Sequence, residues 1–270
     1  MRTDAPFFAL SWMGGGAERA FRRRRSGVDD LPWGTLRPVD HPPVLVDRAR
    51  LAWTDGAYVE YATAVQLSTI VEGLLRVRAP IDLVGMAGDF VADEMLHVEL
   101  HARVVAELGG AVPYRVSEAV LHPAPVFPER PLLDLAWNMV RTCCIGETLA
   151  VPVLAATRKV ANHPLVEAVF ARIVEDEGPH SQLGWLFLEW AELTDDDRAR
   201  LTVLARRELE SIAHTWRDPR STVRDGVTTE GYAVDAVHTL GWLDSEAYVS
   251  TAGAAAAQIG ARLARFGIVV

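Results

Sequence analysis

The chain has 270 residues, of which 50% are hydrophobic and 23% are charged, and its formal net charge is −9. This length is enough for one large domain that would bury about 75% of its unfolded surface without disulfide support. The two cysteines, Cys143 and Cys144, are adjacent, which excludes a disulfide framework, a CxxC redox site and a cysteine-based zinc site. The negative charge argues against nucleic-acid and anionic-membrane binding, so we expect neither partner.

Residues 1–45 are predicted to form an irregular N-terminal arm, because proline and glycine recur throughout them. The arm contains a basic run, Arg22–Arg25, which we interpret as a solvated or partner-contacting segment. The apolar part of the arm precedes these arginines, which is the reverse of the order in a secretory signal peptide. The chain also has no run of about 18 uncharged apolar residues. We therefore expect a cytoplasmic protein without a transmembrane helix.

The rest of the chain has the pattern of long helices with short breaks between them. The predicted helices cover residues 47–78, 82–109, 131–161, 164–193, 194–219 and 245–266. Asp82 is the expected N-cap of the second helix, and Thr194, followed by three aspartates, begins the fifth. Pro219 is expected to close that fifth helix, and residues 220–243 are ambiguous. No strand pattern of convincing length is present.

The first four predicted helices form two hairpins joined by one long, proline-rich connection. A helix of about 27 residues is about 40 Å long, and 20 extended residues reach up to about 66 Å. The connection can therefore return along the whole bundle. We predict an all-α fold in which residues 46–193 form a four-helix bundle with one long crossover, and residues 194–270 form C-terminal helices that pack on it within one domain.

The second and fourth predicted helices carry the same motif, D-E-x-x-H. The two copies and their upstream glutamates are Glu60 with Asp93, Glu94 and His97, and Glu147 with Asp176, Glu177 and His180. A glutamate and a histidine three residues apart lie on one face of a helix, so both can reach one metal ion.

Hairpin geometry places these side chains at one level of the bundle. The midpoint between positions 60 and 94 is residue 77, near the first turn, and that between positions 147 and 177 is residue 162, in the second turn. Four buried carboxylates would carry a severe desolvation penalty, which two divalent cations would offset. Carboxylate and imidazole ligands without thiolate favour iron or manganese over zinc.

This pattern resembles the ferritin-like di-iron carboxylate superfamily, which includes ribonucleotide reductase small subunits, bacterial multicomponent monooxygenases, rubrerythrins and arylamine N-oxygenases. The resemblance covers about residues 47–193. It implies that two iron ions, or a manganese–iron pair, are held by Glu60, Glu94, His97, Glu147, Glu177 and His180. It also implies that Glu94 and Glu177 bridge the metals, that O₂ is a co-substrate, and that a reductase or ferredoxin donates electrons. We also consider a homodimer of this chain as its assembly.

The resemblance also implies partners for the histidine ligands, with Asp93 hydrogen-bonded to His180 and Asp176 to His97. His101 lies one turn past His97, where ribonucleotide reductase small subunits often have a radical tyrosine. We interpret His101 as a hydrogen-bonded core residue close to the ligands, with an extra ligand or a proton relay as the alternative.

Several neighbouring residues have simpler interpretations. Glu72 and Glu99 point away from the ligand faces and are expected to be solvated. Trp53 falls level with His101 and is interpreted as core packing. Gly178-Pro179, inside the second motif, is expected to kink and locally widen its helix.

Inward-facing residues within two turns of the ligands are predicted to form an apolar pocket wall beside the metals. They are Ala64, Phe90, Cys143, Cys144, Val151 and Leu154. Beyond the ligands, His101 and Cys143 are the candidate catalytic groups, although the cysteines fit small core residues better.

The pattern therefore predicts a di-metal enzyme that uses O₂ to oxidise a small organic substrate by hydroxylation, N-oxygenation or dehydrogenation. The alternatives are a ferroxidase or iron-handling protein and a rubrerythrin-like peroxidase. Two complete E-x-x-H motifs, and a C-terminal segment long enough to roof a pocket, favour the enzyme.

Overall fold

The computed structural model describes residues 6–217 and 232–270, and within these ranges the chain is helical. The helices are α1 (Gly15–Arg24), α2 (Pro43–Arg76), α3 (Ile81–Glu107), α4 (Glu118–Leu121), α5 (Pro131–Met139), α6 (Thr148–Val160), α7 (Pro164–Trp190), α8 (Asp195–Arg217), α10 (Val234–Thr239) and α11 (Ser245–Ala264). Single 3₁₀ turns occur at η1 (Val28–Asp30) and η2 (Pro38–Asp40), and a π-helix, η3 (Val140–Glu147), joins α5 to α6. The all-α prediction is confirmed.

Proline sets the start of the main helices. Pro43, Pro131 and Pro164 each occupy the beginning of a helix, where the missing N–H breaks no intrahelical hydrogen bond. Pro80 is the N-cap residue of α3, so the prediction that Asp82 is the N-cap is wrong. Asp82 lies inside the first turn of α3, where its carboxylate favours the positive end of the helix dipole.

The start of α8 follows the sequence prediction. The Thr194 hydroxyl accepts a hydrogen bond from the Asp197 N–H at 3.2 Å, and the Asp197 carboxylate accepts one from the Thr194 N–H at 2.9 Å. This reciprocal pair is a capping box. The predicted stop at Pro219 lies outside the described residues.

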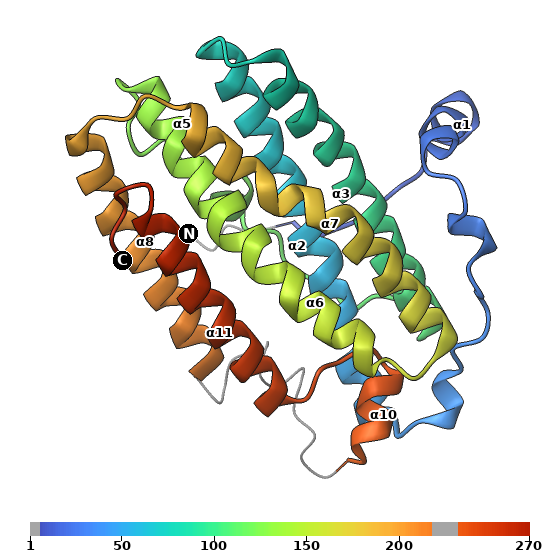
Figure 1. Cartoon of the computed structure of the whole chain (residues 1–270). Coiled ribbons are helices and arrows are strands. Elements are labelled where there is room, and N and C mark those ends of the chain that lie inside the picture. The colour runs from blue at the N-terminus through green and yellow to red at the C-terminus, as the bar shows by residue number, and fades with distance from the viewer. Residues whose placement is uncertain (1–5, 218–231) are drawn as a thin grey trace, which may run out of the picture.

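The long helices pack as a bundle with a second layer on one side. Helix α2 lies along α3 and also contacts α5, and α7 contacts α3, η3 and α6. Helices α8 and α11 contact each other and cover η3 and α6, as the orange and red ribbons of Figure 1 show. Helix α1 stands away from this second layer, in the N-terminal arm (Figure 1).

The hydrophobic core is divided into two large clusters. One contains Leu67 and Ile70 of α2 together with Leu183 of α7, and the other contains Trp53 of α2 and Ile173 of α7. On both helices the boundary between the clusters falls at the level of the glutamates predicted to bind metal. The polar layer therefore has apolar packing above and below it, which limits its contact with water.

The helical run Pro131–Val160 has the length and apolar composition that a membrane-crossing helix needs. Core helices of bundles satisfy the same criterion, and this run packs against α2, α7, α8 and α11. The absence of membrane partners stays a prediction.

Candidate metal centre

Four helical segments bring the six predicted ligands together in the polar layer. Glu60 comes from α2, Glu94 and His97 from α3, Glu147 from the end of η3, and Glu177 and His180 from α7. All except Glu60 are buried, and the Glu60 side chain is only 14% exposed. The alignment expected from hairpin geometry is therefore present in three dimensions.

The six side chains form two overlapping groups, and within each group the potential ligand atoms lie within 4.8 Å of one another. The first group contains Glu60, Glu94, His97 and Glu177, and the second contains Glu94, Glu147, Glu177 and His180. Glu94 and Glu177 belong to both. The two groups are therefore adjacent and have two carboxylates in common.

The two histidines face these shared carboxylates in the same way. His97 Nδ1 lies 3.2 Å from Glu177 Oε1 and 3.7 Å from Glu94 Oε2. His180 Nδ1 lies 3.0 Å from Glu94 Oε1 and 3.3 Å from Glu177 Oε2. Each ring therefore presents its Nδ1 atom to the centre of the cluster.

The outer ring nitrogens face the two aspartates of the motifs. His97 Nε2 lies 3.3 Å from Asp176 Oδ2, and His180 Nε2 lies 3.7 Å from Asp93 Oδ2. A carboxylate beside Nε2 favours the tautomer with the proton on that atom, which leaves the Nδ1 lone pair directed at the cluster. Each aspartate thus lies beside the histidine of the opposite motif, as the resemblance implied.

Each aspartate also has an arginine partner. Arg172 lies 3.1 Å from Asp176 on the same helix, and Arg25 of the N-terminal arm lies 3.3 Å from Asp93. The Arg25 side chain is only 8% exposed, and its Nε donates to the Ala92 carbonyl at 2.9 Å. The interpretation of the basic run as solvated is therefore wrong for Arg25, which is tied to the cluster through Asp93.

The acidic neighbours of the cluster behave differently from one another. The Glu72 side chain is 69% exposed, as predicted, and pairs with Arg76 one turn away. Glu99 is buried, so its predicted solvation is wrong. Arg22 and Arg103 both donate to its Oε1. The N-terminal arm covers this face of α3 and brings Arg22 to it.

The carboxyl groups of the cluster have divergent pKa values. Burial, followed by the charge of Glu94, raises the pKa of Glu60 well above its usual range. Burial and the charge of Glu177 do the same for Glu147. Burial alone would also raise the pKa values of Glu94 and Glu177, but the adjacent imidazoles of His97 and His180 outweigh it and lower both.

The histidines show the complementary effect. Burial opposes the charged form of His180, but Asp93, Glu177 and Glu94 together raise its pKa to about 12. The pKa of His97 is likewise raised well above its usual range, against burial, chiefly by Asp176 and Glu177. In the absence of metal, protons on the imidazoles and on the outer glutamates would neutralise the cluster.

The donor set fits a pair of divalent cations. Both oxygens of Glu94, Oε2 of Glu177, and Nδ1 of both His97 and His180 are buried without a hydrogen-bond partner. These atoms converge without forming well-aligned hydrogen bonds, which is costly in a buried layer unless an ion is bound between them. Four carboxylates balance the charge of two divalent ions, and the absence of thiolate favours iron or manganese.

His101 belongs to neither ligand group, although its Nδ1 lies 3.9 Å from Glu60 Oε1. That nitrogen donates to the His97 carbonyl at 2.9 Å, and burial lowers the His101 pKa to about 4, so the ring is neutral. Its ring packs against Trp53 with centroids 5.1 Å apart, at the predicted level. Gly56 makes room for it, because a Cβ there would lie 2.4 Å from His101 Cδ2.

The π-helix η3 ends at Glu147, one of the six cluster residues. The widening expected at Gly178-Pro179 is absent, because α7 stays an α-helix through both residues, and the π-helix lies in η3 instead. The backbones of η3 and α7 approach closely at Gly184, where a Cβ would lie 2.9 Å from the Cys144 nitrogen. Both cysteines are buried in this contact. Burial, with the charge of Glu147, raises the pKa of Cys143, which leaves it a protonated core thiol.

A cavity of about 670 Å³ reaches Glu60, Glu147 and Glu177 from the side covered by the second helical layer. Apolar residues of its wall include Val59, Leu149, Ala150, Val153, Leu154 and Ile212. Of the predicted wall residues, Leu154 lines the cavity, while Ala64, Phe90, Cys143, Cys144 and Val151 are not part of its lining. Phe90 instead stacks on His180, with ring centroids 4.1 Å apart.

The C-terminal segment helps to roof this cavity, but sequence reasoning did not identify which residues outside the bundle line it. Glu208 and Ile212 of α8, Tyr248 of α11, and Ala119 of α4 all line it. The amphipathic pattern of α8 and α11 was the available signal, but it does not specify which bundle face these helices cover.

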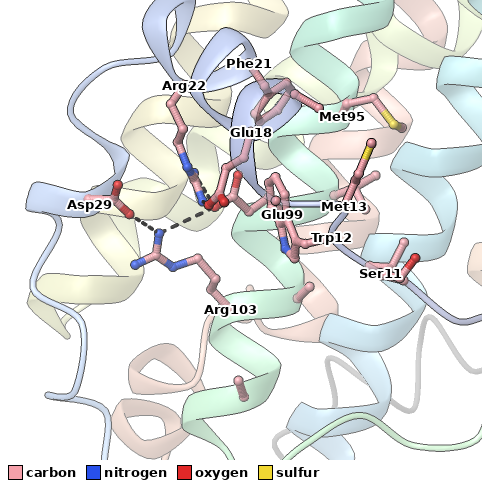
Figure 2. Close-up of a pocket in the computed structure, with 16 residues that line it drawn as sticks. Ser11, Trp12, Met13, Glu18, Phe21, Arg22, Asp29, Met95, Glu99 and Arg103 are labelled. Carbon is pink, nitrogen blue, oxygen red and sulfur yellow. Dashed lines mark hydrogen bonds and ion pairs between the residues drawn. The ribbon is translucent and has the colours of Figure 1, made fainter.

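A second cavity, of about 730 Å³, lies between the N-terminal arm and α3. Figure 2 shows Arg22 and Arg103 directed at Glu99, with Trp12 and Met13 alongside. None of the six cluster residues lines this cavity. It is therefore separate from the space that leads to the candidate metal centre.

Comparison of the chain with models of known protein families finds no match, and neither curated proteins nor solved structures match it. The chain is thus an all-helical protein with a buried glutamate–histidine cluster that is able to hold metal.

Proposed function

We propose that the protein is a di-metal oxidoreductase of the ferritin-like carboxylate type, which uses O₂ to oxidise a small organic substrate. Hydroxylation, N-oxygenation and dehydrogenation all suit such a centre. The observation that carries this proposal is the pair of overlapping glutamate–histidine groups that share Glu94 and Glu177 in a buried layer.

In this proposal Glu60 and His97 serve one metal, Glu147 and His180 serve the other, and the two shared glutamates lie between them. An iron pair, or a manganese–iron pair, would supply electrons to O₂ and oxidising power toward the substrate when bound, with a reductase or ferredoxin restoring the electrons.

The protein's own groups orient the site and limit water. The aspartates beside His97 and His180 hold both rings with Nδ1 toward the cluster. The apolar clusters above and below the polar layer exclude water from those two sides, which strengthens the electrostatic interactions inside it. The cavity gives a substrate access on the side of Glu60 and Glu147.

The same cavity favours substrate oxidation over iron handling. The wall includes Asp55 and Glu208, but Val59, Leu149 and Val153 add apolar surface that an organic substrate can contact and a hydrated iron ion does not need. A small organic molecule would bury apolar surface there, which stabilises its complex by roughly 25 cal/mol per Å² before binding costs.

Iron oxidation in air tests the proposal. Fe(II) is added in increments, oxidation is followed spectroscopically, and retained iron is measured after desalting. An enzyme centre should hold about two irons per chain and consume O₂ repeatedly when a reductant such as ascorbate is present. Retention of many irons per chain as a mineral would contradict the proposal and favour storage.

A pair of matched variants tests whether the cavity admits the substrate. Ala150→Phe narrows the cavity, whereas Ala155→Phe places the same side chain on the exposed face of the same helix. Only the first should slow substrate-dependent O₂ consumption, and both should leave iron content unchanged. Equal effects of the two variants would mean that substrate reaches the metals by another route.

A further inference from the structure

The cavity beside the metal cluster has a polar end that the ligand cluster does not use. Arg141 of η3 and Gln66 of α2 line it there, across the gap between the two helices. We propose that this end binds a carboxylate, and that the substrate class is therefore small organic acids with an apolar body. The inference rests on the proposed function for calling the ligand a substrate.

Arg141 is a half-buried cation without an anionic partner. Among the residues that the structure describes, no carboxylate lies within ion-pair distance of its guanidinium, and its Nη2 donates a long hydrogen bond to Gln66 Oε1 at 3.5 Å. Its Nε is buried and has no hydrogen-bond partner. An anion bound in the cavity would complete the hydrogen bonding of this half-buried guanidinium.

The contacts of Gln66 fix the direction of its amide. Its Oε1 accepts a hydrogen bond from the Thr142 hydroxyl at 2.9 Å and the longer one from Arg141, so the oxygen faces η3. Among the described residues the amide NH₂ has no acceptor, and the guanidinium has further N–H groups beyond the one that contacts Gln66. A site built from donors selects a group that only accepts, and a carboxylate matches the planar fork of arginine in a bidentate manner.

The donor pair lies at a defined place relative to the cluster. Gln66 is six residues beyond Glu60 on α2, and Arg141 is six residues before Glu147 on η3. The two segments are antiparallel, because Gln66 contacts Thr142 whereas Gly73, further along α2, contacts Leu135, which precedes Thr142. Both donors therefore lie at the same end of the cavity, and Gln66 is about 9 Å from Glu60 along the axis of α2 at 1.5 Å per residue.

This separation sets the expected shape of the ligand. A carboxylate held between Arg141 and Gln66 directs the rest of the molecule along the cavity, past the cluster and toward Val59 and Val153. The span suits an aromatic acid or a medium-chain fatty acid, whose apolar body would contact the apolar wall while one of its carbon or nitrogen atoms faces the metals.

Glu208 of α8 provides the alternative explanation that the experiment must exclude. It lines the same cavity as Arg141, so the alternative is that its carboxylate pairs with Arg141 in solution. In that case the arginine would have a structural ion pair with Glu208, and no site for a ligand carboxylate would be needed.

Calorimetric titration of the full-length protein with benzoate and with benzamide, its neutral counterpart, tests the proposal. Benzoate should bind at least about tenfold more tightly than benzamide, since a hydrogen-bonded charge pair contributes more than a neutral one. Arg141→Gln should remove this preference, and Gln66→Leu should reduce it. Glu208→Gln should preserve or increase it, because the competing anion is lost.

Each outcome has one meaning. Equal binding of benzoate and benzamide, a preference that survives Arg141→Gln, or a preference lost equally in Glu208→Gln would overturn the proposal. Gln66→Leu decides the question if Arg141→Gln does not fold. The titrations are run on metal-free and on Mn(II)-loaded protein, and the metal content of each sample is measured. If benzoate binds to the metal and not to Arg141, the preference for benzoate over benzamide persists in Arg141→Gln. If the preference for benzoate depends on Arg141 but the protein takes up no metal, the proposed function is contradicted while the carboxylate site stands.

Discussion

Gly184 provides a test of the close packing between η3 and α7 that positions Glu147. A Cβ at position 184 would lie 2.6 Å from Cys144 Sγ, 2.9 Å from Cys143 Cβ and 2.9 Å from the Cys144 backbone nitrogen. Two of these atoms belong to the main chain or adjoin it, so they cannot move without displacing η3. Gly184→Ala should therefore be destabilising, although alanine favours a helix over glycine.

The magnitude follows from two opposing contributions. Overpacking of a core costs about 1–3 kcal/mol, and the helix propensity of alanine returns roughly 0.5–1 kcal/mol. We expect a net loss of about 1–2 kcal/mol in the free energy of unfolding. Gly88→Ala is the matched control, because Gly88 lies within α3 and a Cβ there meets nothing within 4 Å. It should stabilise the protein by about 0.5–1 kcal/mol.

Urea denaturation of both variants, with the midpoint and slope compared to the parent protein, measures this difference. The expected result is a lower midpoint for Gly184→Ala, a higher one for Gly88→Ala, and unchanged slopes. If Gly184→Ala stabilised the chain as much as Gly88→Ala did, the described contact between η3 and α7 would be incorrect, and with it the position of Glu147.

Two further predictions concern the metal centre. Asp176→Asn should weaken metal binding roughly 10- to 100-fold without unfolding the chain, because the amide no longer holds the His97 tautomer. Isothermal titration with Mn(II) measures the affinity, and an unchanged affinity would refute the role of the aspartate. Folding raises the pKa values of Glu60, Glu147 and His180 above their unfolded values, which are 4.5 for the glutamates and 6.5 for the histidine. Each group therefore stabilises the fold fully below its unfolded pKa, and this stabilisation is lost as the pH rises toward its folded pKa. Metal-free protein should therefore lose stability from pH 6 to pH 8, while the increase in Tm on adding Mn(II) should grow over that range, because the ligands bind metal deprotonated. An increase in Tm that shrinks with pH would contradict this.

The helices and the ligand cluster were largely predictable because both depend on short-range regularities. A repeated E-x-x-H motif fixes a glutamate and a histidine on one helix face, and hairpin symmetry fixes the level of Glu60 and Glu147. The proline at the start of α2, α5 and α7 is also a local signal. These features need no knowledge of how distant segments meet.

The errors arose where distant segments decide the outcome. Helix geometry correctly directed Glu99 away from the ligands, but it could not show that Arg22 of the N-terminal arm covers that face. The same contact of the arm brings Arg25 to Asp93. The cavity wall was misjudged for the same reason, since α8 and α11 supply part of it.

The widened helix was expected at the wrong position. Proline at position 179 removes one hydrogen bond, yet α7 remains regular around it. The π-helix forms instead at η3, in a stretch without proline, where the packing of Cys143 and Cys144 against Gly184 brings η3 close to α7. A change in hydrogen-bond register of this kind follows from packing and leaves no compositional signal.

The metal content of the purified protein tests the central claim most directly. The chain is loaded anaerobically with Fe(II), desalted and measured by elemental analysis beside Glu94→Ala, which removes a carboxylate shared by both ligand groups. We predict about two iron ions per chain for the parent protein and loss of both sites in the variant, because each group depends on Glu94. Saturation at one ion, or no retained metal, would contradict the assignment of this cluster as a di-metal centre.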